Sequence, residues 1–500
     1  MSFLAFGLTL ATVSLSALPH SASSPEFFLT QIVCRDDDNR FCNPNLDLYA
    51  ETLIDLPNCI GPDFAEHPCL KTDRLVPIAT NQQQLKADFP NRTSSFINAK
   101  LLSNDLRSSM TNISLVSGLF TSLLVALTFL TIRKSSYGGP YLFTILVSTA
   151  FTENLVVQAS IAPIGVSTTS MLSALVLTYA IMNNRSTKYE TYLMYLLLFV
   201  QLVLVSLFRK DQAMILIATV FLITVVDVIR YIITGGSKQP IPGYFQKRTF
   251  LVGLVVCTIG ACLVSPFVAS SDKSVISKVS DSVDYVVPKY IAAPSMGTRL
   301  STELGSSSFQ NTLVEFLKSP IYYSINVGRF LLDLVHSSGY QQSQWIPFLV
   351  GIFVFLVVFF LIVFLKTDFK RWPFLTMGPV VLVVMLVTLK GVLDAGTRSN
   401  LRYVFALLQF LLFLVFKSGL DVNPRIFIQR IINWIYGILL FQALIIWIYL
   451  SKSSGMDFGY VYIGSVGLSL LASALLLLSG KLLTSLARWS MDWVLESEDR

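Results

Sequence analysis

The sequence has little charge and almost no histidine. Only 13% of its 500 residues are Asp, Glu, Lys or Arg, about half the usual share in a soluble protein. A water-soluble fold of this length needs a charged surface that such a composition does not supply, whereas 53% of the residues are hydrophobic. The chain also lacks a phosphate-binding loop, a dinucleotide fingerprint and a CxxC pair. We therefore expect a membrane protein with no catalytic residues, no metal site and no cofactor.

Long hydrophilic segments are scarce as well, and the first of them holds most of the cysteine. An apolar run before it predicts a signal peptide over residues 1–23, cleaved near Ala22 or Ser23, with an uncleaved anchor as the alternative. Four of the six cysteines follow in residues 24–112: Cys34, Cys42, Cys59 and Cys69. In the secretory pathway an even number of cysteines usually pairs, so we expect a small disulfide-bonded luminal domain. Bonds between consecutive cysteines would close the shortest loops.

Three sequons for N-glycosylation are present, and their positions relative to the predicted spans indicate which of them can be modified. Asn91 lies well before the first apolar span, where the modifying enzyme can reach it. Asn112 abuts that span, and Asn184 falls in a connector expected in the cytosol. The sequence therefore predicts a glycoprotein with one glycan, on Asn91.

Apolar runs of about 17 to 23 residues, the length of a membrane helix, fill most of the remaining chain. They predict about eleven spans: 113–132, 141–161, 166–182, 191–208, 213–233, 249–269, 346–365, 374–389, 403–417, 432–450 and 458–480. The fold class is therefore an all-α polytopic bundle, with six spans in residues 113–269 and five in 346–480. A luminal loop with two amphipathic helices, residues 270–345, joins the two groups. Because two spans are short, about nine to twelve are compatible with the pattern.

Basic residues indicate the orientation of the bundle. With residues 24–112 in the lumen, the cytosolic connectors hold fifteen Lys and Arg, and the short luminal connectors hold six. This distribution follows the positive-inside rule. We expect a luminal N-terminus, a cytosolic C-terminus and residence in the endoplasmic reticulum or membranes derived from it.

Four polar residues inside the predicted spans are candidates for function, because each is costly in lipid unless paired or hydrated. Glu153 and Asn154 lie in the second span, where Glu153 either packs against a polar neighbour or forms a functional site. Asp227 and Arg230 lie three residues apart in the fifth span, so they share a helix face and can pair.

Small residues recur every four positions in the sixth span, from Gly253 through Cys257 and Ala261. Such a stripe favours close packing of another helix. Cys257 and Cys262 are expected to stay reduced, because a spacing of five residues points them apart on a helix.

The last twenty residues, 481–500, continue the helical period. One face of this tail carries four apolar side chains: Leu482, Leu486, Trp489 and Trp493. The pattern predicts either an amphipathic helix on the cytosolic leaflet or an extension of the last span.

This layout resembles virus-encoded polytopic membrane proteins, most of all the multi-spanning proteins of flavi-like viruses, including the jingmenvirus group. The resemblance covers the whole chain as architecture, with no diagnostic motif. It implies a non-enzymatic glycoprotein of the virion envelope or one that remodels the endoplasmic reticulum. Its partners would be the lipid bilayer and copies of itself or other membrane proteins, not nucleic acid.

Two other functions fit parts of the sequence. A transporter or channel would use Glu153, Asp227 and Arg230 to line its path. A glycosyltransferase with a lipid-linked donor would use luminal acids, for which Asp36, Asp37 and Asp38 are candidates; the chain resembles that family only in its general layout.

Overall fold

The computed structural model describes residues 1–16, 106–149, 164–183, 188–233, 244–268, 376–384, 386–387, 405–422 and 459–498, together with residues 433, 437 and 440. Several predictions lie outside these residues: the cysteines Cys34, Cys42, Cys59 and Cys69, the sequon at Asn91, the polar pair Glu153 and Asn154, and the loop 270–345.

The described part of the chain is all-α and contains no strand. Its helices are α1 (Ser2–Ser16), α7 (Leu106–Ile132), α8 (Gly138–Thr149), α10 (Ile164–Asn183), α11 (Lys188–Phe208), α12 (Lys210–Ile233), α13 (Tyr244–Val268), α20 (Phe405–Val422) and α22 (Gly459–Glu498). Leu, Val, Ile and Phe dominate these helices, and in a bilayer the α-helix satisfies every backbone polar group within one segment.

Six of these helices are long and apolar enough to cross a membrane: α7, α10, α11, α12, α13 and α22. They match six of the predicted spans, which confirms the prediction of an all-helical body with several membrane-length helices and is consistent with an integral membrane protein. The predicted total of about eleven spans remains a prediction.

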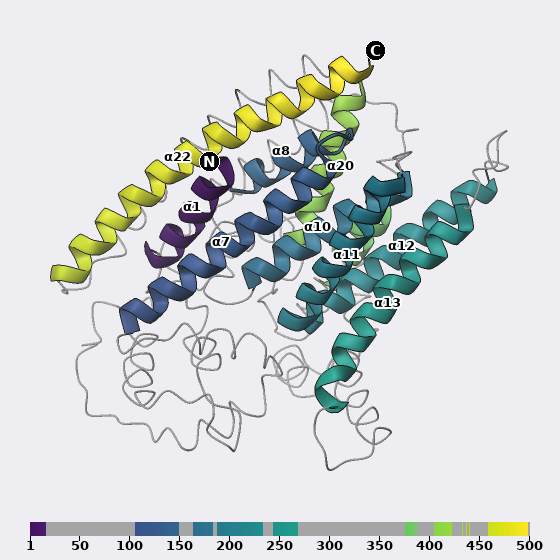
Figure 1. Ribbon diagram of the computed structural model, residues 1–500, viewed down its shortest axis with the longest axis horizontal. Helices are drawn as coiled ribbons and strands as arrows, with labels where there is room; N and C mark the ends of the chain where they lie inside the picture. The colour runs from purple at the N-terminus through teal and green to yellow at the C-terminus, as the bar shows by residue number, and fades with distance from the viewer. Residues whose placement is uncertain are drawn as a thin grey trace, which may run out of the picture.

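Helix α10 forms the centre of the bundle. It packs against α7, α11, α12 and α20, and 94% of its spanning window is buried, against 28–44% for the other five spanning helices. Figure 1 shows it enclosed by its neighbours, with α22 and α13 at opposite edges. The outer helices therefore expose apolar faces of the kind that lipid covers, while α10 is surrounded by protein.

Tyr179 of α10 anchors an aromatic cluster at the core. Its ring lies edge-on to Tyr137, Phe410 and Phe413, with centroids 5.9, 6.3 and 6.0 Å away. Phe410 and Phe413 stack on each other at 5.8 Å. The aromatic quadrupole favours edge-on ring pairs of this kind. Here they pack α10 against α20 and against the turn before α8.

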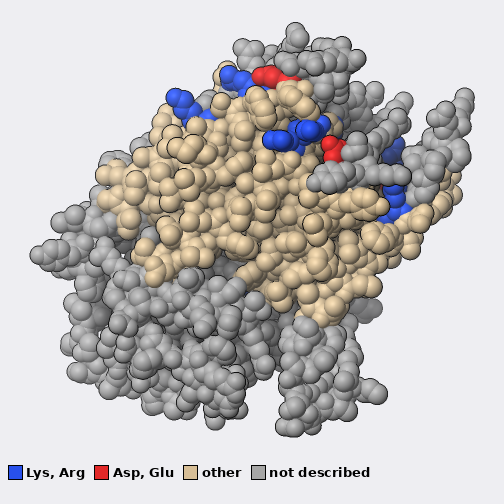
Figure 2. Space-filling view, viewed as in Figure 1, with Lys and Arg blue, Asp and Glu red and all other residues tan. Residues whose placement is uncertain are grey.

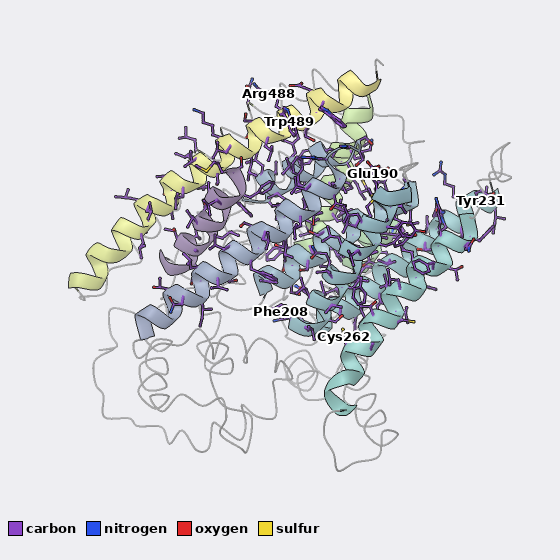
Figure 3. All side chains as sticks on the ribbon, in the orientation of Figure 1. Glu190, Phe208, Tyr231, Cys262, Arg488 and Trp489 are labelled. Carbon is purple, nitrogen blue, oxygen red and sulfur yellow. The ribbon has the colours of Figure 1, made fainter. Side chains whose placement is uncertain are left out.

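Charged side chains gather towards one end of the bundle. In Figure 2 the visible Lys, Arg, Asp and Glu lie in the upper part of the described surface, and the rest of that surface is uncharged. Figure 3 relates this distribution to α11, which runs from Glu190 near the charged end to Phe208 at the other end. The end at Phe208 is not free of charge, since Arg209, partly exposed, follows directly.

Helix α22 differs from its predicted boundary. The last span was expected to end at residue 480, but the helix continues without interruption to Glu498. The tail is therefore an extension of the last span, the second of the two forms that the sequence allowed. Ser490 and Met491 pack against Gly138 and Gly139 at the start of α8, and this contact supports the added length.

Candidate functional site

The strongest candidate among the intramembrane charges is an ion pair between two neighbouring helices. Asp227, near the end of α12, binds Arg248, near the start of α13, through the arginine Nε. Both side chains are less than a tenth exposed. The two helices form a hairpin, so positions near the end of the first and the start of the second lie at the same level.

This pairing adds a partner that the sequence analysis missed. The spacing of three residues predicted Arg230 as the partner of Asp227, whereas Arg248 was assigned to a cytosolic connector. Arg230 is partly exposed. The helix hairpin is the signal that could have identified Arg248. In a hairpin, a charged residue within two turns of the end of the first helix lies opposite a charged residue in the first turns of the second helix.

Aromatic side chains lie near this corner of the bundle. Tyr231 of α12 meets Phe245 of α13 edge-on at 5.7 Å, and Tyr195 of α11 meets Phe250 in the same way at 5.2 Å. Phe245 and Phe250 are 51% and 57% exposed, so these rings do not enclose the ion pair. Both charged side chains are themselves buried, and in this low-dielectric surrounding they interact more strongly than at an open surface. These contacts connect α11, α12 and α13 and therefore stabilise the packing of the three helices.

A second polar group joins α10 to the start of α12. Ser167 donates a hydrogen bond to the Oε1 of Gln212, and the Nε2 of Gln212 donates to Thr168 at 3.3 Å. Further along α10, the hydroxyls of Ser173 and Tyr141 share a hydrogen bond of 3.0 Å, which connects α10 to α8. Interhelical bonds of this kind act as polar glue between membrane helices.

Other buried polar groups in the described part of the chain lack a hydrogen-bond partner. Both amide atoms of Gln201 on α11 and of Gln409 on α20 are buried and unpaired. The same holds for the hydroxyls of Thr169, Ser170 and Thr178 on α10. Gln201 and Ser170 each lie 13 residues from the short connection between their helices, so they occupy the same depth. Unpaired polar groups in a core are unusual and call for a specific explanation.

Lys417 is buried at the end of α20, where its Nζ lies 5.5 Å from the centre of the Tyr137 ring. A cation over an aromatic face is stabilised by the ring quadrupole. Lys417 is the last residue of the predicted span 403–417 and was counted among the fifteen cytosolic basic residues, whereas the structure places its charge against the aromatic cluster of Tyr179. No feature of the sequence alone links Lys417 to Tyr137.

The small-residue stripe of α13 does not pack as expected. Neither Gly253 nor Gly260 has any atom within 4 Å of an added Cβ, and Cys257 is exposed. No described helix therefore approaches this face closely. Cys257 and Cys262 are not joined in a disulfide, as their spacing predicts. Figure 3 shows Cys262 on α13, towards the end away from Tyr231.

The predicted apolar face of the tail lies on the outer side of α22. Trp489 and Trp493 are 51% and 38% exposed, and Leu482 and Leu486 are partly buried. The residues that pack inward are on the other side of the helix, among them Leu483, Ala487 and Met491. Figure 3 labels Trp489 beside Arg488 on α22, so an aromatic ring and a cation share this exposed part of the helix.

Among the described residues, no three His, Cys, Asp or Glu side chains stand close enough together to hold a metal ion. Comparisons with protein-family models, curated proteins and solved structures find no match for this chain. Function is therefore argued from the polar contacts and exposed surfaces of the helices themselves.

Proposed function

We propose that this chain is a non-enzymatic, multi-pass membrane glycoprotein whose role is to organise membranes. The observation that carries the proposal is α22, a single helix of 40 residues with one face bound to the body and the other exposed. At ~1.5 Å per residue it is about 60 Å long, roughly twice the thickness of the hydrocarbon core. A rigid helix of this length must tilt or emerge from the bilayer.

Trp489 and Trp493 lie on the exposed part of this helix, close to Arg488. Indole rings favour the headgroup region, where one edge meets lipid and the other meets water. Arg488 lies beside Trp489 and the exposed Asp492 lies beside Trp493, so the charges here are mixed and the indole rings are the main membrane anchor. A helix held firmly by the body can thus impose a fixed tilt on an aromatic anchor, and several copies together would deform the surrounding bilayer.

The charges of the described bundle support the same function. A transporter would direct Asp227 and Arg230 to a common path, but Asp227 binds Arg248 at a contact between helices. The partners that this function requires are lipids and copies of the chain or other membrane proteins. The resemblance to flavi-like viral membrane proteins assigns these partners to a virion envelope or to remodelled endoplasmic reticulum.

Replacing Trp489 and Trp493 with serine tests this function. The double variant should fold, because both side chains lie outside the packed face of α22, yet it should reduce the deformation of membranes in cells that express the protein. Electron microscopy of those cells, with expression level matched, is the measurement. Leu470→Ser with Leu471→Ser is the control, since these residues are about as exposed on the same helix but far from the tail. Normal deformation by the tryptophan variant would contradict the proposal.

A second function, transport of a small polar solute or ion, is favoured by one observation. Gln201 and Gln409 are buried with both amide atoms unpaired, and an unsatisfied polar group in a membrane interior costs several kcal/mol. Water or a polar solute could supply the missing partners. Because Gln201 lies at the depth of Ser170, the interface of α10 and α11 is where such a solute would bind.

The variant Gln201→Leu separates the two functions. If the amide has no partner, leucine removes an unsatisfied group of similar size, and the thermal stability in detergent should stay the same or rise. If the amide binds water or a solute during transport, the variant should fold but lose flux in proteoliposomes. We expect unchanged or higher stability and no flux in either protein. Flux in the wild type that Gln201→Leu abolishes would establish transport.

A further inference from the structure

The N-terminal helix α1 lies antiparallel against α7, inside the helical body. The Phe3 ring meets Phe129 at 5.9 Å near one end, and Ser14 accepts a hydrogen bond of 3.1 Å from Ser114 near the other. Figure 1 shows α1 between α7 and α22, and both helices pack against it. The segment that the sequence predicted as a signal peptide therefore has a defined binding site within this fold.

The contact between α1 and α7 is closest at two glycines. A Cβ added to Gly118 of α7 would lie 2.5 Å from the carbonyl oxygen of Gly7 and 3.0 Å from the backbone nitrogen of Ala11. Because these are backbone atoms, no rotamer change can relieve the overlap. Gly7 and Ala11 are four residues apart on α1, as are Ser114, Gly118 and Ser122 on α7. This is the small-xxx-small pattern by which membrane helices approach closely. Here both α1 and α7 contribute small residues to the contact.

Most of the remaining surface of α1 is also enclosed, although Leu4 is 50% exposed. Phe6, Leu10 and Val13 are at most 1% exposed and belong to the main apolar cluster of the body. Thr9 is fully buried and bonds to the carbonyl of Ala5 at 2.7 Å, so its polar hydroxyl is satisfied within the helix. Removal of α1 from the folded protein would expose both this apolar cluster and the face of α7 around Gly118.

We infer that α1 is a permanent structural helix that fills the groove between α7 and α22 and stays there after targeting. Cleavage near Ala22 or Ser23, the site predicted from the sequence, falls beyond the end of α1. A cut there would leave the helix whole, held by its contacts with α7 and α22. Retention does not depend on the membrane-organising function proposed above.

Retention also fixes the position of the first residue. Since α1 is antiparallel to α7, Met1 lies towards the C-terminal half of α7, the end of the helix that is followed by the basic residues Arg133 and Lys134. With the orientation that the basic residues predict, Met1 is cytosolic and residues 24–112 are luminal. The sequence analysis expected a luminal N-terminus, which applies only to a chain from which α1 has been removed.

Mass spectrometry of the full-length protein tests retention directly. The chain carries an affinity tag at its C-terminus and is purified in mild detergent as a single species. We expect residues 2–16 in a one-to-one ratio with residues 106–132, either in the intact chain or as a separate peptide that elutes with it. A folded, uniform protein that lacks residues 2–16 would overturn the inference.

A matched pair of glycine variants tests the close contact. Alanine favours helix over glycine, so Gly253→Ala, where the added Cβ meets nothing within 4 Å, should keep or slightly raise the Tm. Gly118→Ala should lower the Tm by about 2 °C or more despite the same gain in propensity, and should reduce the amount of residues 2–16 recovered. Equal Tm changes in the two variants would contradict close packing of α1.

If Gly118→Ala does not accumulate, Gly7→Ala probes the same contact from the other helix. Its added Cβ meets the movable hydroxyl of Ser122 at 2.7 Å, so a smaller decrease in Tm is expected. A Tm equal to or above that of the wild type would count against the inference.

Discussion

Replacing Arg248 with methionine should lower the free energy of unfolding by roughly 3 kcal/mol or more, the usual cost of leaving one member of a buried ion pair alone. Asp227 would keep its buried position on α12 without the Arg248 guanidinium that pairs with it. Methionine keeps an unbranched apolar stem but is two heavy atoms shorter than arginine, so the loss contains a packing contribution as well as the charge. The measurement is thermal unfolding in detergent, monitored as the fraction of protein that remains monodisperse after heating.

Two further variants make this result specific. Lys247→Met removes a positive charge from the adjacent, exposed position and should leave the stability nearly unchanged. Asp227→Asn combined with Arg248→Met removes both charges and should recover part of the loss, because no lone charge stays buried. A loss as large in Lys247→Met, or no recovery in the double variant, would show that Asp227 and Arg248 do not act as a buried pair.

Truncation of Tyr179 to alanine should be the other severe change, with a loss of about 3–5 kcal/mol. The ring touches Tyr137, Phe410 and Phe413, so its removal leaves a cavity between α10, α20 and the turn before α8. Because α10 is enclosed by protein, lipid cannot fill the space. We expect a large decrease in Tm and in the yield of folded protein.

Tyr192→Ala is the matched control for this prediction. Tyr192 lies on the neighbouring helix α11 and is 72% exposed, so its truncation opens no cavity and should change the Tm by little. Similar losses in the two variants would show that the aromatic cluster contributes no more than an average position on the surface.

The helices could be predicted from the sequence because their signal is local. A run of some twenty apolar residues has few structures available to it in a bilayer, and α7, α11, α12 and α13 begin and end within a few residues of the predicted bounds, apart from N-terminal extensions on α7 and α13. The end of α22 was predicted less well, since polar residues from Lys481 onward resemble a boundary although the helix continues over them.

Contacts between helices were not predictable in the same way. Gly118 and Gly253 both belong to stripes of small residues, but only Gly118 is packed. Only Gly253 was singled out from the sequence, because its stripe includes cysteines. Which stripe meets another helix depends on the positions of α1, α7 and α13 in space, and the spacing of residues within one helix does not contain that information. The same reason hid the partnership of Asp227 with Arg248.

The position of α1 also has a consequence for the order in which the protein is assembled. Helix α1 packs against α22, the last helix described in the chain, so two segments that are far apart in the sequence meet in one structure. Contacts between such distant segments close late. Until residue 459 and those after it have been synthesised, one side of α1 has no protein to cover it. Chains that stop before α22 would present this side of α1 to lipid or to quality-control factors, which gives the cell a means of recognising them.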